Sequence, residues 1–151
     1  MDELTKFLQT QTVIQISPKA GEPWIANVMM TCETPEQLYF VGSTKRLYGQ
    51  QLLADETLAF ATAWHEVQNH ANRKGVQGVG IARPVTSEAE MSEAVALHNR
   101  DYPALAEQVT FEVLRENTFG LHVWCITPTF IKFWNDELYG RDGTETFTFG
   151  S

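Results

Sequence analysis

Four consecutive polar residues, Ser43, Thr44, Lys45 and Arg46, are the strongest candidates for chemistry in the sequence. They follow the apolar run LYFVG and belong to a helix that we expect at residues 44–53. Hydroxyls at a helix cap, free backbone N–H groups and two cations all favour a bound anion such as phosphate. Without an anion, cations in the first turn of a helix are disfavoured by about 0.3–1 kcal/mol each. The alternative is a solvated surface turn with two exposed cations.

The stretch WHEVQNHA suggests a zinc helix at first sight, because zinc hydrolases place two histidines four residues apart with a glutamate between them. Here His65 and His70 are five residues apart, which turns them about 140° away from a shared helical face. The polar segment 65–75 is also typical of a loop. We therefore predict no metal site, and a zinc hydrolase built on His65, Glu66 and His70 ranks last among the functions considered.

Other motifs give weaker signals. GVQGVG reverses the order of a dinucleotide-binding loop and continues as a strand. Cys125 lies in an apolar strand-like run and no Gly-x-Ser-x-Gly elbow is present, so a catalytic nucleophile is not indicated. Trp134 precedes the polar stretch NDELYG, and aromatic residues at such a rim often cover a flat ligand or a subunit interface.

Most of the secondary-structure elements that we expect around these candidate residues are short strands. Two-residue alternation between Pro and Gly turns predicts strands, and the capping-box pair Ser87 and Glu90 starts a helix. The expected elements are a helix at 2–11, strands at 12–17, 23–32, 38–42, 57–64 and 74–87, a helix at about 88–99, a further helical stretch after a break at Asp101–Pro103, and two strands within 118–136 interrupted at Pro128. The tail 137–151 is expected to be an arm on the surface or on a partner.

These elements predict a mainly β fold with peripheral helices. Six or seven antiparallel strands would form a closed or nearly closed barrel, which removes exposed edges. The strands do not alternate with long helices, which disfavours a doubly wound sheet. We expect one domain over residues 1–151, with an N-terminal helix at 1–11, first barrel strands at 12–86, a helical insertion at 87–116 and closing strands with a tail at 117–151.

Length, charge and cysteine content exclude several classes of protein. A chain of 151 residues suits a single core. The formal net charge of −8 disfavours a binder of nucleic acid or anionic membranes, whose affinity rests on clustered Lys and Arg. No apolar run is long enough to span a membrane, and the acidic N-terminus differs from a signal peptide. Cys32 and Cys125 are expected to be buried free thiols in a reducing cytoplasm, and a disulfide is the alternative.

The order of the segments resembles the pyridoxamine 5′-phosphate oxidase-like family of FMN-binding split barrels. The similar stretches are VIQISPKAGEPWIANVMMTC, LYFVGSTKRLYGQQLLADETLAFA and GVQGVGIARPV. Two later stretches, LHNRDYPALA and FIKFWNDELYG, are similar to a small uncharacterised bacterial branch of that family. The resemblance covers roughly residues 1–145, and the order and spacing of the motifs carry it.

The resemblance implies a six-stranded antiparallel split barrel that forms a homodimer with two FMN sites across the interface. The flavin ring would rest against the strand residues Ala26, Asn27, Val28 and Met29, whose backbone groups would contact the edge of the ring. The ribityl chain and phosphate would face Ser43, Thr44, Lys45, Arg46 and Gln51. Gln77 would lie near the ring or the neighbouring subunit, and Trp134 is a further cofactor-binding candidate.

The sequence departs from the family at four positions where its oxidases carry phosphate-binding cations. The residues at these positions are Ala26, Thr31, Leu47 and Tyr48. Each charge-assisted hydrogen bond to phosphate is worth roughly 1.5–3 kcal/mol, so FMN affinity would fall by orders of magnitude unless Lys45 and Arg46 substitute. We therefore expect an FMN-dependent oxidoreductase of another small substrate rather than a pyridoxamine-phosphate oxidase. The alternative is a non-enzymatic split barrel that binds a deazaflavin, haem or a metabolite.

Overall fold

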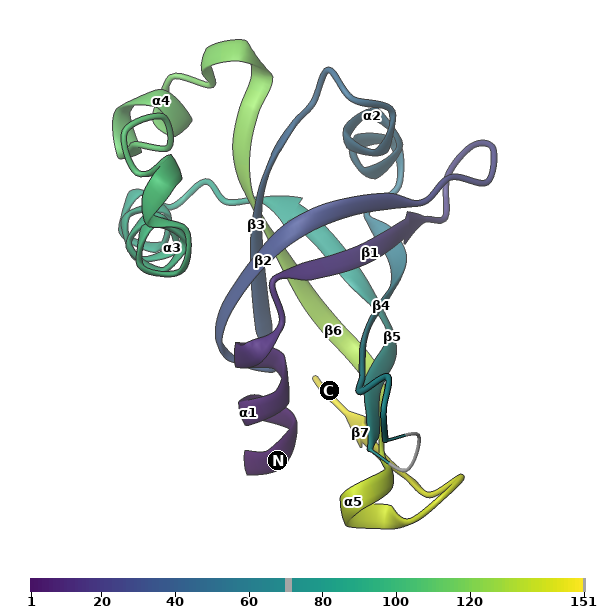
Figure 1. Cartoon of the computed structure of the whole chain (residues 1–151). Coiled ribbons are helices and arrows are strands. Elements are labelled where there is room, and N and C mark those ends of the chain that lie inside the picture. Colours follow the sequence, from purple (N-terminus) through teal and green to yellow (C-terminus); the bar gives the residue numbers. More distant parts are fainter. Residues whose placement is uncertain (70–71, 151) are drawn as a thin grey trace.

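The computed structural model describes residues 1–69 and 72–150 as a β-barrel with peripheral helices (Figure 1). Seven antiparallel strands lie in the order β3-β2-β1-β4-β5-β6-β7, and a further pairing of β3 with β6 closes six of them into a barrel. The strands are β1 Val13–Pro18, β2 Ala26–Thr34, β3 Gln37–Ser43, β4 Thr57–His65, β5 Arg73–Pro84, β6 Leu121–Asn135 and β7 Thr144–Thr148. The expected six-stranded antiparallel barrel is confirmed.

The helices lie outside the barrel or across its ends. They are α1 Asp2–Thr10, α2 Leu47–Ala54, α3 Glu88–Asp101, α4 Phe111–Arg115 and α5 Asp136–Tyr139, with short 3₁₀ turns η1 Pro103–Leu105 and η2 Thr118–Gly120. Half of the capping box predicted for α3 is present: the Ser87 hydroxyl accepts a hydrogen bond from the Glu90 backbone N–H, whereas the Glu90 carboxylate accepts from the Tyr39 hydroxyl at 2.9 Å. Figure 1 shows α1 below the strands, with α2 and η2 at the opposite end.

Apolar side chains from alternating strand positions fill the barrel. On β1, Ile14 and Ile16 are fully buried, whereas their sequence neighbours on the strand are exposed or half-buried, as the two-residue period of a strand requires. Phe40 and Trp124 stack inside the barrel with ring centroids 5.9 Å apart. At the end below the strands, Phe7 of α1 stacks on Phe133 of β6 at 5.5 Å, so α1 closes the core there.

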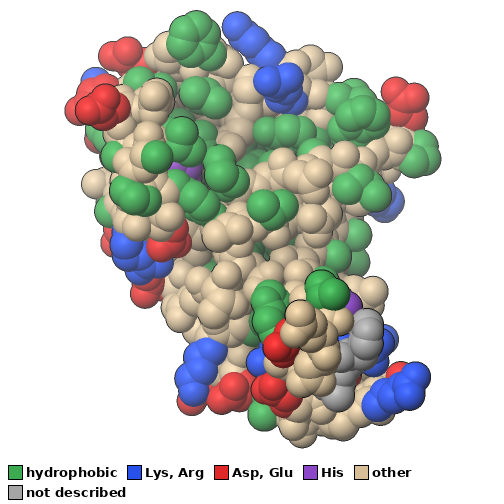
Figure 2. Space-filling view, in the orientation of Figure 1, with side chains coloured by type: hydrophobic (Ala, Val, Ile, Leu, Met, Phe, Trp, Pro, Cys, Tyr) green, Lys and Arg blue, Asp and Glu red, His purple; other side chains and the backbone are tan. Residues whose placement is uncertain are grey.

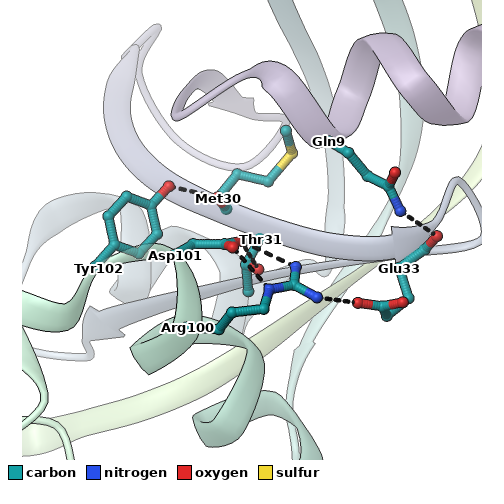
Figure 3. A network of polar contacts seen from close by, with 7 residues as sticks. All are labelled: Gln9, Met30, Thr31, Glu33, Arg100, Asp101 and Tyr102. Carbon is teal, nitrogen blue, oxygen red and sulfur yellow. Dashed lines mark hydrogen bonds and ion pairs between the residues drawn. The ribbon is translucent and has the colours of Figure 1, made fainter.

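Helix α3 is docked on β2 by a polar network (Figure 3). The Thr31 hydroxyl donates to the Asp101 carboxylate, and Arg100 pairs with the carboxylates of both Asp101 and Glu33. The Tyr102 hydroxyl donates to the Met30 carbonyl at 2.5 Å. A second apolar cluster beneath the helices continues this contact. Its buried members are Tyr39, Val85, Met91, Ala94, Val95, Val109, Leu114 and Val123.

The expectation of two strands interrupted at Pro128 was wrong, because β6 is one strand. Pro128 stands opposite Gly80 of β5, and the register shifts there so that Thr129 is an extra residue. Such a bulge accommodates a proline, which has no N–H to donate to the ladder. Gly80 is required because a Cβ there would lie 2.4 Å from the Thr127 carbonyl oxygen.

The C-terminal tail is also more ordered than a surface arm. Strand β7 pairs with β6 from Phe130 opposite Thr148 to Trp134 opposite Thr144. It therefore covers the outer edge of β6 and adds a seventh strand outside the barrel.

The segment expected as a loop at 65–75 is partly strand, because β4 continues to His65 and β5 begins at Arg73. His70, part of the rejected zinc motif, lies outside the described residues. Cys32 is buried as expected, Cys125 is only half-buried, and both are free thiols. In the described part of the chain, no helix is long and apolar enough to cross a membrane.

Candidate functional site

The turn at Ser43–Arg46 connects the end of β3 to α2, and it differs from the expected helix cap. Helix α2 begins at Leu47 rather than residue 44, with Arg46 as its N-cap. The Thr44 backbone N–H donates to the Gly120 carbonyl at 2.9 Å, and the Arg46 N–H donates to the Ser43 carbonyl at 3.1 Å. These bonds hold the backbone of the turn outside the helix.

The two hydroxyls of the turn bind protein rather than facing solvent. Ser43 Oγ donates to the Phe119 carbonyl at 2.9 Å, and Thr44 Oγ1 donates to the Gly120 carbonyl at 3.2 Å. A hydroxyl has one hydrogen to donate, so neither side chain can donate to a phosphate in this arrangement. Their role is to fasten η2 onto the turn, which sequence patterning did not reveal.

The N-terminus of α2 is nevertheless an open positive site. Arg46 makes no side-chain cap, and the first turn of the helix contains no acidic residue. The first N–H groups of a helix have no intrahelical acceptor, and they lie directly after Lys45 and Arg46. Both cations are exposed and form no ion pair with a carboxylate in the described residues. Burial lowers the pKa of His122, which stands opposite Gly42 just before the turn, below its ordinary value.

Gln51, expected to face the cofactor, is 6% exposed on α2. Its amide nitrogen donates to the Glu22 carbonyl at 2.9 Å, which ties α2 to the turn between β1 and β2. The amide oxygen is enclosed and has no hydrogen-bond donor within the described residues. Buried polar groups in proteins almost always have a partner, so this oxygen marks a place where a further donor would be stabilising.

The strand residues Ala26, Asn27, Val28 and Met29 lie where the barrel splits. They pair with β1, but the pairing of β2 with β3 begins only at Met30. One backbone edge of this segment therefore has no strand partner in the described sheet. Val28 is buried in the core and can contact a ligand only through its backbone, whereas Asn27 and Met29 point outward.

The outer face of the barrel carries a shallow groove of about 270 Å³, and Gln77 is the one predicted site residue among those that line it. One row of cross-strand neighbours runs over four strands, from Asn27 on β2 through Gln15 on β1 and Ala61 on β4 to Gln77 on β5. Within this row, the Gln15 side chain donates to the Asn27 amide oxygen at 3.0 Å. The small side chain of Ala61 leaves the depression between the larger residues. Figure 2 shows that the middle of the visible face is uncharged, whereas most charged side chains lie at its periphery.

Trp134 is half-buried and lies apart from the turn at Ser43–Arg46. Its ring covers Gly75, where a Cβ would come within 2.2 Å of the indole. Together with Gln77, Trp134 lines a second cavity of about 450 Å³ between β5, β6 and the segment before β7. The structure therefore brings Gln77 together with Trp134, whereas Asn27 lies three strands away on β2 and lines neither depression.

None of the four residues Ala26, Thr31, Leu47 and Tyr48 carries a cation that could bind a phosphate. The buried Thr31 hydroxyl is committed to Asp101, and Ala26 and Leu47 have apolar side chains. Tyr48 turns inward, with its ring 6.2 Å from that of Phe40. Burial raises the pKa of the Tyr48 hydroxyl, despite opposing effects of the Ser43 backbone and the Arg46 charge.

One residue at the site was missed by sequence reasoning. Phe119 has a φ of 58° and is 75% exposed, although a bulky residue with positive φ is uncommon and strained. The hydrogen bonds from Ser43 and Thr44 to residues 119 and 120 hold it there. The sequence TFG gave no signal for this conformation, because it reads as the start of a strand.

Comparison with known proteins supports the fold. No protein-family model matches the chain, and no curated protein matches it by sequence. The heme binding protein from Mycobacterium smegmatis has a similar structure, with a TM-score of 0.72 and 18% identity over 95% of this chain. The chain spans only 55% of that protein's length.

Two further solved structures are similar over most of both chains. HutZ, the heme storage protein from Vibrio cholerae, has a TM-score of 0.67 and 12% identity, covering 97% of this chain and 92% of HutZ. An FAD-binding protein from Mesorhizobium loti has a TM-score of 0.63 and 14% identity, covering 85% and 87%. At these identities the similarity shows the fold alone. The chain is thus a split barrel of the kind found in flavin-binding and heme-binding proteins.

Proposed function

We propose that this chain binds FMN and serves as a flavin-dependent oxidoreductase of a small substrate. The observation that carries the proposal is the open N-terminus of α2, where uncapped backbone N–H groups lie beside Lys45 and Arg46. A phosphate monoester suits this site, because its oxygens accept hydrogen bonds from backbone N–H groups and from cations. Since the Ser43 and Thr44 hydroxyls are used within the protein, the two cations would supply the side-chain contacts.

The unpaired backbone edge of Ala26–Met29 supports the placement of a flavin ring. Backbone N–H and C=O groups away from β1 at Asn27 and Met29 would meet the hydrogen-bonding edge of the ring in the split between β2 and β3. The unpartnered Gln51 amide oxygen would accept from a ribityl hydroxyl if the turn containing Glu22 shifted. The flavin supplies hydride and electron transfer, and the protein orients it and excludes water.

A homodimer is part of the same proposal, with the outer barrel face as its interface. Val13 and Met29 are cross-strand neighbours on β1 and β2, and Val79 and Phe130 are neighbours on β5 and β6. Val13 and Met29 are 40% and 43% exposed, and Val79 and Phe130, on the other side of the barrel, are 44% and 37% exposed. A second copy packed on the β1–β2 side would cover Val13 and Met29 and would bring its own Gln77 near the strand Ala26–Met29.

The Lys45→Ala, Arg46→Ala double variant tests the phosphate assignment. Each charge-assisted contact is worth roughly 1.5–3 kcal/mol, so FMN affinity should fall by at least about 100-fold. A matched control is Lys19→Ala, Arg141→Ala, which removes two exposed cations away from the turn. Calorimetric titration measures the FMN affinity of the wild type, the double variant at the turn and the control double variant. Thermal unfolding confirms that both variants fold. Equal affinity in wild type and the double variant at the turn would refute the assignment.

The second candidate is a non-enzymatic barrel that binds haem or a deazaflavin. Ala26, Thr31, Leu47 and Tyr48 favour it, because none of these residues can replace the phosphate-binding cations of the family. Haem carboxylates would also pair with Lys45 and Arg46, so these two cations do not distinguish haem from FMN. Mass spectrometry of the natively purified protein, with its visible spectrum, distinguishes flavin from haem or deazaflavin.

A further inference from the structure

The inward face of three strands continues beyond the apolar core at the α1 end of the barrel. Trp64 of β4 pairs with Lys74 of β5, which pairs with Asn135 of β6. Directly opposed residues share a face of the sheet, and so do residues two apart on one strand. The preceding row is formed by the buried residues Thr62, Val76 and Phe133. A row of an indole, an ammonium and an amide therefore follows the last row of the core.

This row forms one wall of a cavity of about 350 Å³. Ligand-binding pockets for small molecules start at about this size, roughly 300 Å³. The opposite wall comes from the N-terminal segment, with α1 lying across the end of the barrel (Figure 1). The lining residues from that side are Glu3, Lys6, Phe7, Thr10 and Gln11.

Asn135 is the polar anchor of the cavity. It is 4% exposed, and its amide oxygen accepts from the Leu138 backbone N–H at 3.2 Å to cap α5. Its amide nitrogen donates to no acceptor in the described residues. This nitrogen is not fully enclosed by protein, because the only fully enclosed side-chain atoms without a partner in the described part of the chain are Gln51 Oε1 and Asn72 Oδ1. The Asn135 amide nitrogen therefore reaches open space. A buried residue thus presents two N–H donors to the cavity.

Lys74 adds a positive charge next to this donor. Its ammonium lies 5.7 Å from the Trp64 ring centroid, and its side chain is 27% exposed. Its carboxylate partner, Glu137, is 3.2 Å away and 54% exposed. A second ammonium, on Lys6, pairs with the exposed Glu3 at 3.2 Å. Such exposed ion pairs are weak, so a bound anion can compete with either carboxylate.

We propose that this cavity binds a small amphipathic anion, a carboxylate attached to a flat apolar body. The carboxylate accepts hydrogen bonds from the Asn135 amide and pairs with Lys74, while the apolar body packs between Trp64 and Phe7. The site is independent of the proposed flavin site, because α1 and the turn at Ser43–Arg46 lie at opposite ends of the barrel (Figure 1).

Calorimetric titration with benzoate tests the proposal, with benzyl alcohol and acetate as probes of each half of the ligand. We expect saturable binding of benzoate with Kd on the order of 0.1–1 mM, and at least about tenfold weaker binding of both other probes. No heat of binding for benzoate, or equal affinity for benzoate and benzyl alcohol, would overturn the proposal.

Two variants test the named contacts. Asn135→Asp keeps an oxygen to cap α5 but replaces the donor by a carboxylate, and Lys74→Met removes the cation. Each should weaken benzoate binding at least about tenfold, whereas Lys19→Met, an exposed control away from the cavity, should bind as wild type does. Thermal unfolding verifies that each variant folds. If Asn135→Asp does not fold, the benzoate affinity of Lys74→Met tests the proposal by itself. Unchanged affinity in a folded variant contradicts the contact that it removes.

Discussion

At the scale of single residues, the turn at Ser43–Arg46 has two hydroxyls that stabilise its structure and two cations that can bind an anion. Its hydroxyls donate to the Phe119 and Gly120 carbonyls, and its cations are free to meet an anion. Phe119 and Gly120 both have positive φ, 58° and 70°. Two substitutions at these neighbouring positions should therefore change stability in opposite directions.

Phe119→Gly should raise the free energy of unfolding, by up to about 1 kcal/mol, because it relieves a left-handed bulky residue whose exposed ring loses little packing. Gly120→Ala should lower it by about 1–2 kcal/mol, because a Cβ there would lie 3.0 Å from Thr44 Oγ1 in a strained conformation. Urea unfolding measures both variants. A loss of stability in Phe119→Gly would show that the ring is packed or the backbone unstrained.

The sequence indicated the residue types at this site but not their hydrogen-bond partners. Ser43 and Thr44 were predicted as helix caps, because hydroxyls before a helix usually have that role. Ser43 Oγ does accept locally from the Lys45 backbone N–H at 3.1 Å. The carbonyls to which both hydroxyls donate are 76 positions away in the chain, and no local pattern reports so distant a contact. Lys45 and Arg46 were predicted to bind a phosphate, with a solvated turn as the alternative; both side chains are exposed, and the phosphate assignment stays a prediction.

At the scale of elements, the docking of α3 on β2 depends on the network around Asp101 (Figure 3). The buried Thr31 hydroxyl donates to the Asp101 carboxylate, to which Arg100 also donates. Burial acts to raise the pKa of Asp101, but the hydrogen bonds from Arg100 and Thr31 outweigh it and hold the pKa below its usual value. The ionised carboxylate therefore stabilises the fold at neutral pH, and this contribution is lost as the pH falls through the lowered pKa.

Asp101→Ala should lower the free energy of unfolding by about 1–3 kcal/mol at neutral pH, because it leaves the Thr31 hydroxyl buried without an acceptor. Thr31→Val is the matched variant, because it removes that hydroxyl and leaves Asp101 paired with Arg100. It should lose less stability than Asp101→Ala. Chemical unfolding of both proteins gives the comparison, and the reverse order would show that the hydrogen bond does not govern the docking.

The strands were predictable where local pattern and tertiary pairing agree. Alternation placed β1 and β4 within one residue of their observed bounds, because each strand has one buried face. Pro128 misled the prediction, because a proline normally ends a central strand. The bulge at Thr129, opposite Gly80, resolves the conflict, and it depends on a partner strand that the local sequence does not identify.

At the scale of the whole molecule, several groups link stability to alkaline pH. Burial, with the nearby charges of Asp101 and Glu33, raises the pKa of Cys32 from 9.0 to about 12. Burial likewise raises the pKa of Cys125 to about 11 and that of Tyr102 to about 12. Above about pH 9 the unfolded chain loses protons that the folded protein retains. Stability should therefore fall as the pH rises.

The expected slope is up to about 1.4 kcal/mol per pH unit for each fully buried thiol. Urea unfolding from about pH 8 to about pH 10.5 measures it, and Cys32→Ala should show a smaller slope because one titrating thiol is removed. A stability that stays constant or rises over this range would contradict the burial of Cys32.

The central claim is that the barrel holds a flavin between two copies, and its most direct test is titration of the wild-type protein with FMN. Analytical ultracentrifugation on the flavin absorption band gives bound flavin and particle mass together. The account predicts saturable binding, with one flavin per chain on a particle of twice the chain mass. Absence of binding at FMN concentrations of about 100 μM, where even a weak site would fill, would contradict it.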